Sequence, residues 1–512
     1  MAVERGRFLN FRFDGSLPYV CVMRTPDRRL LIMHHSGEYP APTLFIGGAW
    51  RATADCRKLE VRDPATGETI SELPIATASD LDEALDAAAR GFEVWRRTPA
   101  NERATVLRRA AQLMRERAPQ IGAITTWEQG KPVRESTAEA AACGDIFDWY
   151  AEEARRAYGR IVPSKQPGVR HLVTMEPVGP VAAFSPWNFP TTIPSRKMAA
   201  ALAAGCSVII KPAEETPCSC LALARALDDA GLPKGVLNVV FGAPAQISEY
   251  LIASTVIRKV SFTGSTVVGK HLAGLAAKVM KPTTMELGGH APVIVFDDAD
   301  LDQAIRVMAA SKYRNAGQIC IAPTRFYLHE RIHDEFVEKF ARAAKALRLG
   351  HGLDASTTMG PLANPRRVEA MERLIGDACD RGAGIAAGGT KQNGPGNFWS
   401  PTVLVNVPTE ALAMNEEPFG PLAVTQRFSS FDEAVRQANR LPCGLAAYAF
   451  TRSARTAADI GDAIEAGMVG INFGVLTGPE TPFGGIKESG YGSEGGIEGL
   501  DAYFTHKYIA QG

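Results

Sequence analysis

Three polar residues, Asn188, Glu286 and Cys320, stand in short segments that are otherwise apolar or rich in glycine. Asn188 lies within Pro-Trp-Asn-Phe-Pro, Glu286 opens Glu-Leu-Gly-Gly, and Cys320 ends Gly-Gln-Ile-Cys. A thiol is a strong nucleophile only as the thiolate, so acyl chemistry at Cys320 needs a nearby proton acceptor and a donor for the developing oxyanion. Glu286 suits the first role and the amide of Asn188 the second. The trio therefore predicts covalent catalysis through a thiol.

Strands and helices that alternate along the chain are expected to position these residues. Short β-rich runs are separated by helical patterns, at 181–184, 207–210, 236–241, 256–262 and 291–296, and a second such series follows residue 300. This alternation indicates parallel sheets, which bind ligands at the carboxyl ends of their strands. Upstream, apolar spacings of three and four predict a helix with Ser79 as its N-cap and another that begins at Asn101.

Composition indicates a globular chain of two or more domains. It has 512 residues, of which 46% are hydrophobic, and its formal net charge is zero. No long basic run stands out, so we expect no nucleic-acid partner. The longest apolar stretch, 198–210, is too short to span a bilayer, so we expect no membrane partner either.

The nine cysteines are odd in number and form no C-x-x-C pair. This pattern is typical of free thiols in a reducing compartment, so we expect a cytoplasmic protein without a metal site. Cys218 and Cys220 follow a proline at an expected helix start and are interpreted as packing or surface thiols. No disulfide is predicted.

Residues 1–42 lack the periodicity of the following chain, and we expect them to carry no chemistry. They are rich in arginine but match an organelle transit peptide only weakly, and no apolar core of a secretory signal occurs. Met33 precedes the first family-like run, 44–48, and so the residues before it are interpreted as an over-extended gene start.

Seven collinear motifs resemble those of the aldehyde dehydrogenase superfamily over about residues 43 to 510. They are P-W-N-F-P, K-P-A-E-E-T-P, F-T-G-S-T, E-L-G-G, G-Q-I-C, E-E-P-F-G-P and P-F-G-G-I-K-E-S-G. The resemblance implies an α/β fold and a homodimer or homotetramer. The implied parts are a Rossmann-like NAD-binding domain (43–160 and 178–288), an α/β catalytic domain (289–488) and a small β bridging or oligomerisation arm (161–177 and 489–512).

The resemblance also implies a reaction in which Cys320 attacks an aldehyde carbon to give a thiohemiacetal. The side chain of Asn188 and the backbone N–H of Cys320 would hold the oxyanion. After oxidation by NAD, Glu286 would activate the water that hydrolyses the thioester. Lys197 matches a family lysine associated with proton movement, although a surface helix lysine is an equal alternative.

The cofactor site implied by the resemblance gathers at strand ends. Adenosine ribose would be held by Lys211 and Glu214, the pyrophosphate by Gly264 and Ser265 at a helix N-terminus, and the nicotinamide ribose and ring by Glu417 and Phe419, with Trp187 packed nearby. A carboxylate at Glu214 repels a 2′-phosphate, which favours NAD over NADP. Residues 490–495 also spell G-x-G-x-x-G, but no strand precedes them, and they are interpreted as a turn-rich segment near the active-site mouth.

Two arginines near the predicted catalytic residues suggest the substrate. Arg196 and Arg314 resemble the carboxylate-binding arginines of the succinate-semialdehyde and α-ketoglutarate-semialdehyde dehydrogenases, and guanidinium groups grip carboxylates well. The predicted substrate is therefore an ω-oxo acid, succinate semialdehyde or α-ketoglutarate semialdehyde. A general aliphatic or aromatic aldehyde dehydrogenase is the alternative, in which both arginines make structural ion pairs.

Two other classes of protein are compatible with parts of this pattern. A thiol hydrolase would use Cys320 without redox chemistry, but such enzymes usually employ a histidine base, and only His290 lies near a motif. A non-catalytic protein on the same fold would be expected to lose Cys320 or Glu286, and both are present. Reduction of NAD on addition of an aldehyde distinguishes the three.

Overall fold

The computed structural model describes residues 39–52 and 57–512. The expected N-terminal extension, including Met33, therefore lies outside the described residues except for 39–42. Within the described part of the chain, no helix is long and apolar enough to cross a membrane.

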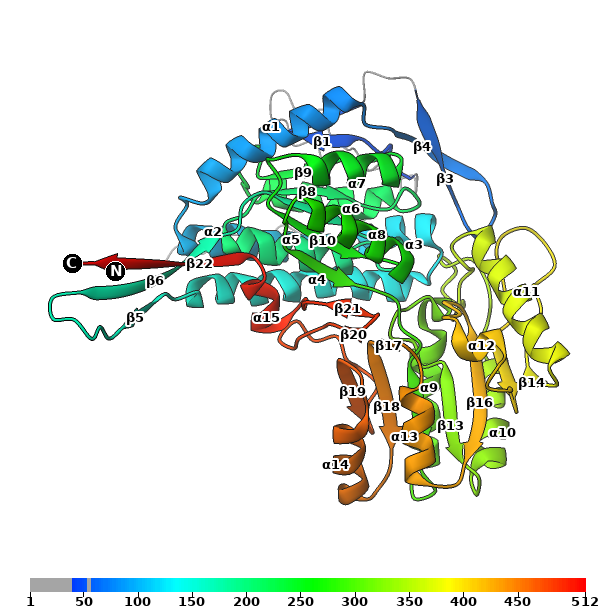
Figure 1. The fold of residues 1–512 in the computed structure, drawn as a ribbon. Helices are drawn as coiled ribbons and strands as arrows, with labels where there is room; N and C mark the ends of the chain where they lie inside the picture. The colour runs from blue at the N-terminus through cyan, green and yellow to red at the C-terminus, as the bar shows by residue number, and fades with distance from the viewer. Residues whose placement is uncertain (1–38, 53–56) are drawn as a thin grey trace, which may run out of the picture. The chain divides into compact units, whose positions relative to one another are not determined.

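The first sheet has eight strands and carries the motifs up to Glu286 (Figure 1). Its order is β2 (Ala49–Arg51), β1 (Leu44–Ile46), β9 (Leu237–Val239), β8 (Val208–Lys211), β7 (Val181–Phe184), β10 (Lys259–Thr263), β11 (Thr283–Glu286) and β21 (Gly490–Tyr491). The strands from β9 to β11 are parallel. β7 and β8 are apolar and fully buried, as expected for strands covered on both faces.

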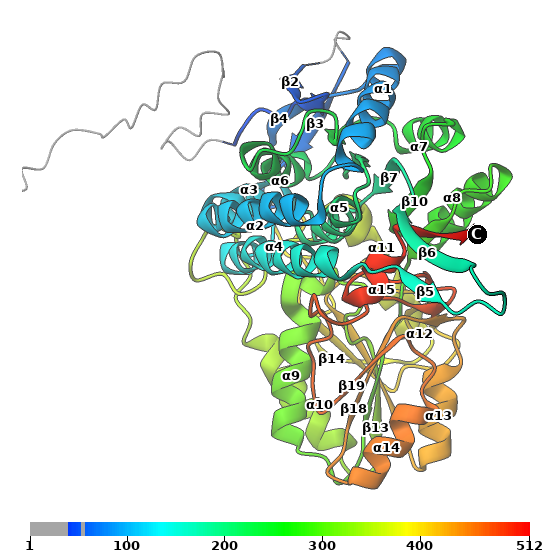
Figure 2. The ribbon, with the colours of Figure 1, turned by 90° about the vertical axis from the view of Figure 1, so that its left-hand side faces the viewer.

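Helices cover both faces of this sheet (Figure 2). One face carries α5 (Thr192–Ala204) and α6 (Pro217–Asp229), and the other carries α1 (Ala78–Trp95), α7 (Pro244–Ala253) and α8 (Thr266–Lys278). The chain runs from β7 through β8 to β9 and then returns to β10 on the opposite side of β7. Strand order thus reverses between β7 and β10, and an open α/β sheet binds its ligand at such a reversal.

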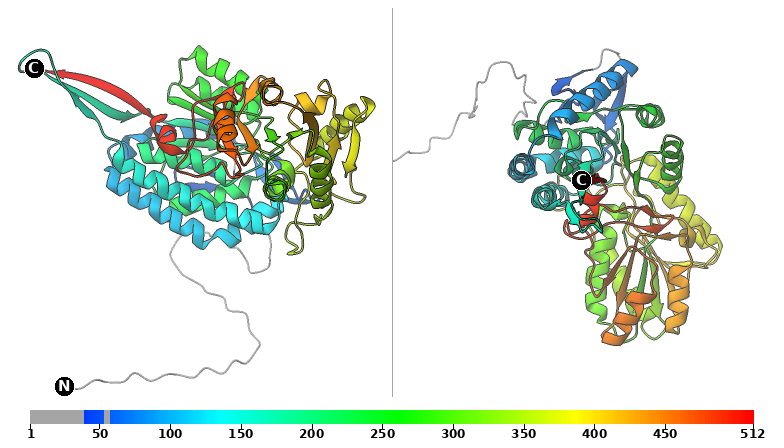
Figure 3. Two further views of the ribbon diagram at one scale, coloured as in Figure 1. Left: turned by 90° about the horizontal axis from the view of Figure 1, so that it is seen from below. Right: turned by 60° about the vertical axis from the view of Figure 1, so that its left-hand side comes forward.

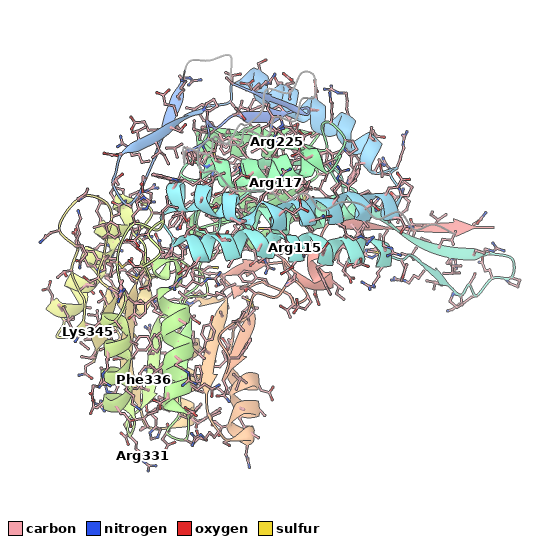
Figure 4. All side chains as sticks on the ribbon, turned by 180° about the vertical axis from the view of Figure 1, so that it is seen from behind. Arg115, Arg117, Arg225, Arg331, Phe336 and Lys345 are labelled. Atoms are coloured by element: carbon pink, nitrogen blue, oxygen red, sulfur yellow. The ribbon has the colours of Figure 1, made fainter. Side chains whose placement is uncertain are left out.

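A further helical layer packs outside α5 and α6. It consists of α2 (Ala100–Glu116), α3 (Ala118–Gln129) and α4 (Val133–Glu153). On its outer face, Arg115 pairs with Asp145 at 2.7 Å and with Asp148 at 2.6 Å, joining α2 to α4 (Figure 4). This layer matters for the site because the α3–α4 junction reaches the loop after β7.

The second sheet has seven strands. Its order is β14 (Gly384–Ala387), β15 (Thr402–Val405), β16 (Leu422–Phe428), β13 (Arg325–His329), β12 (Pro292–Val295), β18 (Ala446–Phe450) and β19 (Met468–Ile471). All neighbours are parallel except β14 and β15. α9 (Leu301–Tyr313) and α10 (His333–Lys345) cover one face, where Phe336 packs against the rings of both Phe326 and Phe340 (Figure 4).

A narrow arm projects from the body of the molecule (Figures 1 and 3). It is a three-stranded antiparallel sheet of β5 (Arg160–Val162), β6 (Arg170–Pro177) and β22 (Phe504–Gln511), and the C-terminus lies at its tip. Ile161 and Tyr508 on this arm expose 72% and 60% of their surface. Self-association through this arm, and the division into domains, stay predictions.

The α/β fold class is confirmed, and each predicted strand occurs within a few residues of its expected bounds. The run at 291–296, however, forms β12 of the second sheet and not part of the first. β11, which carries Glu286, was not predicted as a strand. The prediction of Ser79 as N-cap is wrong, because Thr77 caps α1: it accepts from Asp80 N at 3.2 Å, and Asp80 Oδ2 accepts from Thr77 N at 2.8 Å.

We expect Thr77→Ala to lower the free energy of unfolding by about 1 kcal/mol, because it removes one half of this capping box. Chemical denaturation measures the change. Ser79→Ala is the matched control, since Ser79 lies exposed in the first turn and makes no cap. An equal loss in both variants would contradict the assignment of the cap.

Candidate functional site

The loop after β7 carries Asn188 into the gap between the two sheets. Asn188 is 2% exposed, and its Nδ2 donates to the carbonyl oxygen of Gln318 at 3.1 Å. The amide has a second N–H that this bond leaves free to donate. Asn188 therefore lies beside the segment that leads to Cys320, as the sequence predicts.

The segment before Cys320 has a constrained backbone. It follows α9 as a short turn, η2 (Arg314–Gly317), in which Asn315, Ala316 and Gly317 have φ values of 49°, 51° and 72°. A Cβ on Gly317 would lie 2.1 Å from the carbonyl oxygen of Gly420, so only glycine fits there. This turn places the partly exposed Cys320 against the Gly288–Gly289 connection, where a Cβ on Gly289 would lie 2.9 Å from Cys320 O.

Glu286 ends β11 at the same edge of the sheet. Its side chain is buried, and neither carboxylate oxygen has a hydrogen-bond partner within the described residues. Burial raises the pKa of Glu286 well above its usual value, and Glu494 raises it further, while Lys197 and Arg196 act in the opposite direction. Such a carboxyl group is poised to take and hold a proton.

Cys320 and Glu286 are close enough to influence each other. Burial raises the pKa of the Cys320 thiol above its usual range, and the carboxylates of Glu417 and Glu286 add to this, whereas the N–H groups of Cys320 and Ile321 oppose it. The resting thiol is therefore protonated, and nucleophilic attack requires removal of its proton. The structure thus brings Asn188, Glu286 and Cys320 together.

Lys197 is not a surface residue. Its side chain is fully buried on α5, and Nζ donates to Glu494 Oε1 at 2.5 Å and to Ser261 Oγ at 3.1 Å. The surface-lysine alternative is wrong, because α5 is buried on every side. Sequence reasoning missed Glu494, which lies in the glycine-rich segment 490–495, and its only signal was a lone carboxylate among glycines.

The predicted ribose-binding residues follow β8. Lys211 is buried, forms an ion pair with Glu214 and donates to Pro212 O at 3.1 Å. Burial raises the pKa of Glu214, and the ammonium group of Lys211 opposes the rise. Both residues are shielded from solvent, since Lys211 is 5% exposed and the side chain of Glu214 only 18% exposed.

The predicted pyrophosphate residues follow β10. Ser265 is the N-cap of α8, and a Cβ on Gly264 would lie 2.4 Å from the ring of Phe262. Gly264 N donates to Glu286 O at 3.1 Å, which ties this turn to the end of β11. The free backbone N–H groups in the first turn of α8 thus lie beside the point where the strand order reverses, between β7 and β10.

Glu417, Phe419 and Trp187 form a third group. Trp187 and Phe419 meet edge to face with their ring centroids 5.5 Å apart. Burial raises the pKa of Glu417 to about 8 against the opposing effects of Gly289 N–H, Arg367 and Lys312. A Cβ on Gly288 would lie 2.7 Å from Glu417 Oε2, so this carboxyl group adjoins the turn after Glu286.

These groups fit a bound dinucleotide. Glu417 Oε1 and Thr263 Oγ1 are buried and without partners within the described residues, and they lie beside the carboxyl ends of β10 and β11. Buried polar atoms are rarely left unpaired, and here hydroxyl groups of a ligand would satisfy them. The contacts of Lys211, Glu214, Gly264, Ser265, Glu417, Phe419 and Trp187 with a cofactor stay predictions.

Arg196 lies one residue before Lys197 on α5 and is 5% exposed. Its Nη2 donates to Thr477 O at 2.8 Å, and its guanidinium carbon lies 5.2 Å from the ring centroid of Phe483. Nη1 is buried and has no hydrogen-bond partner in the described residues. A buried guanidinium group with a free N–H donor is well suited to bind an anion.

Arg314 differs from Arg196 in being exposed. Its guanidinium carbon lies 5.4 Å from the ring centroid of Phe189, next to Asn188. Among the described residues, neither arginine forms an ion pair, although Arg314 acts to lower the pKa of Glu135 against the effect of burial. Both charges are available near the predicted nucleophile.

His290 does not serve as a base for Cys320. Its Nε2 lies 3.2 Å from Ala413 O, and its own carbonyl accepts from Arg325 Nε at 2.9 Å. Burial lowers the pKa of His290 well below its usual value, and Arg325 lowers it further. The seven cysteines in the described part of the chain are free thiols, and no group of three or more His, Cys, Asp or Glu residues there is arranged to hold a metal ion.

Comparison with known proteins agrees with this geometry. A profile of the Aldehyde dehydrogenase family matches residues 50–509. Putative 4-(hydroxymethyl)benzenesulfonate dehydrogenase TsaD2 of Comamonas testosteroni is 48% identical over 92% of this chain and 98% of its own length. The NADP(+) succinate-semialdehyde dehydrogenase GabD of Escherichia coli (strain K12) is 42% identical over 91% of this chain and 97% of its own.

A solved structure gives the same answer. The crystal structure of succinate-semialdehyde dehydrogenase from Burkholderia pseudomallei superposes with a TM-score of 0.91 at 43% identity, covering 94% of this chain and 99% of that one. The similarity in sequence and in fold to these proteins therefore covers the whole site. The chain belongs to the aldehyde dehydrogenase family and is an oxidoreductase that acts on aldehydes with a nicotinamide cofactor.

Proposed function

We propose that this enzyme oxidises aldehydes that carry an anionic group at their far end, with an ω-oxo carboxylic acid as the leading substrate and NAD as the cofactor. The observation that carries the proposal is the buried, unpartnered Nη1 of Arg196. A neutral tail would leave this donor unsatisfied, at a cost of about 1–3 kcal/mol, whereas a carboxylate would accept from it. Relatives named for succinate semialdehyde and for glutarate semialdehyde support an acidic substrate.

A sulfonate is the second candidate for the anionic group. TsaD2 is named for a benzenesulfonate, and a relative from Pseudomonas putida is named as a 3-sulfolactaldehyde dehydrogenase at 43% identity. Carboxylates and sulfonates both accept hydrogen bonds from a guanidinium. The exposed position of Arg314 would allow it to follow tails of different length.

In the proposed mechanism, Cys320 releases its thiol proton to solvent water and attacks the aldehyde carbon as the thiolate. The second N–H of Asn188 and the backbone N–H of Cys320 stabilise the oxyanion of the thiohemiacetal. Bound NAD supplies the two-electron acceptor of the oxidation. Glu286 then takes a proton from the water that hydrolyses the thioester, and Glu494 of the nearby Lys197–Glu494 pair helps to raise its pKa.

We expect Glu286→Gln to lower kcat by about 10²- to 10⁴-fold, because an amide cannot act as a general base for deacylation. The acylated enzyme should accumulate, and intact-protein mass spectrometry would detect the thioester. Since the pKa of Glu286 is raised, wild-type kcat should climb with pH through a midpoint above the usual carboxyl range, and the variant should lose this dependence. Cys320→Ala is the control that forms no adduct.

We expect Arg196→Met to lower kcat/KM for succinate semialdehyde by about 10- to 100-fold, the equivalent of one charged hydrogen bond, while the methionine preserves the volume of the buried stem. Kinetics with α-ketoglutarate semialdehyde, 3-sulfolactaldehyde and butanal would define the anion preference. The kcat/KM for butanal should change little. Arg331→Ala, in a remote exposed pair with Asp297, is the matched control (Figure 4).

Equal losses for the acid and for butanal would show that Arg196 acts through the fold or through the pKa of Glu286 and not on the substrate, and would remove the anionic substrate class. Adding Arg314→Ala to the Arg196 variant should extend the selective loss to about two to four decades. If the double variant loses no more kcat/KM than the Arg196 variant alone, Arg196 is the only one of the two arginines that binds the anion.

We expect Glu214→Ser to raise the ratio of NADP to NAD turnover, because it removes the carboxylate that opposes a 2′-phosphate and frees Lys211 to pair with it. Glu215→Ser is the matched control, since Glu215 pairs with Arg366 at 3.0 Å and not with Lys211. Preference of the wild-type enzyme for NADP would contradict the assignment of NAD.

A further inference from the structure

Lys131 contacts the backbone of Asn188 from the junction between α3 and α4. Its side chain is 1% exposed, and Nζ donates to Asn188 O at 2.8 Å and to Glu139 Oε2 at 2.6 Å. Nζ also lies 4.1 Å from the ring centroid of Phe189. Burying an ammonium group costs free energy unless the group is paired with an opposite charge, so the buried position of Lys131 depends on Glu139.

Glu139 uses its other oxygen on the far side of the same loop. Oε1 accepts from Thr191 N at 3.1 Å, from Thr191 Oγ1 at 2.7 Å and from Thr192 N at 3.0 Å. These groups belong to the start of α5, which the side chains of neighbouring residues do not cap. The Lys131–Glu139 pair therefore holds this loop at two points, at Asn188 itself and at its junction with α5.

Asn315 contacts the same carbonyl oxygen. Its Nδ2 donates to Asn188 O at 2.9 Å, and its Oδ1 accepts from Gln129 Nε2 at 2.8 Å. Its backbone N–H donates to Glu135 Oε2 at 2.9 Å. Both lone pairs of Asn188 O are thus used, and the α3–α4 junction fixes the loop of Asn188 relative to the turn that precedes Cys320.

We propose that Lys131, held by Glu139, is a positioning residue for oxyanion stabilisation: it fixes the Asn188 peptide so that the side-chain amide points at the reacting carbonyl. This inference rests on the proposed role of Asn188. A donor stabilises a transition state fully only when it is already oriented before charge develops. A charge-assisted bond to Asn188 O is stiffer than the neutral bond that Asn315 supplies.

A double-mutant cycle between Lys131 and Asn188 tests this directly. Asn188→Ala should lower kcat about 10²- to 10³-fold, as removal of one oxyanion donor does. Lys131→Met should lower kcat about 10- to 100-fold, the effect of a displacement near 1 Å, with little change in KM. In the Asn188→Ala background, Lys131→Met should cost almost nothing more, because its target is already absent.

Thermal unfolding separates this role from plain support of the fold. Lys131→Met leaves Glu139 as an unpaired buried charge and should lower the Tm, and Lys131→Met with Glu139→Gln should recover most of the Tm but not kcat. Should the single variant fail to fold, the cycle is run with this charge-neutral pair. Lys281→Met is the matched control, because Lys281 donates to the backbone carbonyls of Ile252 and Ser254 at the opposite edge of the sheet.

Additive losses in the cycle, or recovery of kcat together with the Tm in the charge-neutral pair, would overturn the positioning role of Lys131. If the Asn188→Ala variant instead keeps the kcat of the wild-type enzyme, the proposed role of Asn188 is wrong, and this inference is wrong with it. Non-additive loss together with unrecovered kcat is the result expected.

Discussion

Burial of polar atoms without partners is the constraint on which this site depends. Proteins pair the great majority of such atoms, and each exception costs about 1–3 kcal/mol. Here Glu286, Asn188 Oδ1, Arg196 Nη1 and Glu417 Oε1 are all exceptions, and they gather where the two sheets meet. A ligand that brings both hydrogen-bond donors and acceptors would satisfy them. Without its ligands, the folded protein is thus less stable than it would be if apolar side chains occupied these positions. The large apolar cores offset that cost.

Close backbone approach is the second constraint, and glycine meets it. Residues 287–291 pass from β11 in the first sheet to β12 in the second, with Glu286 at their start. Along this passage and opposite it, Gly289 faces Cys320 O, Gly317 faces Gly420 O, and Gly490 faces Met285 O, each within 3.0 Å of where a Cβ would lie. No side chain fits these positions without moving a neighbouring backbone. The glycines of the motifs therefore help to set the separation of Glu286 and Cys320.

The sequence predicted much of this arrangement because its signals are local. Buried parallel strands such as β7 appear as short apolar runs, and Asn188, Glu286 and Cys320 stand out as polar residues among apolar ones. Thr77 was missed because two hydroxyl-bearing residues, Thr77 and Ser79, both precede the helical pattern and compete as caps, and only the contact with Asp80 decides between them. β11 was missed because two threonines and a methionine before Glu286 give no apolar run.

Lys131 and Glu139 could not have been found in this way. Lys131 lies in the junction between α3 and α4 and Glu139 lies on α4, both far from Asn188 in the chain, and a lysine and a glutamate near a helix start usually predict a solvated surface. Their burial results from tertiary packing of the helical layer against α5, which no local pattern encodes. Glu494 was missed for the same reason, because its partner Lys197 is almost 300 residues away.

The charges around Glu286 respond unequally to a ligand. Lys197 and Arg196 both lower the pKa of Glu286, and Glu494 raises it. Lys197 is already committed to Glu494 and Ser261, so its effect is fixed by the fold. Arg196 has a free donor, so an anion bound there would offset part of its positive potential at Glu286. Glu286 would then hold its proton more tightly while the acid is bound, which couples the affinity of the far end of the substrate to the strength of the base at its reacting end.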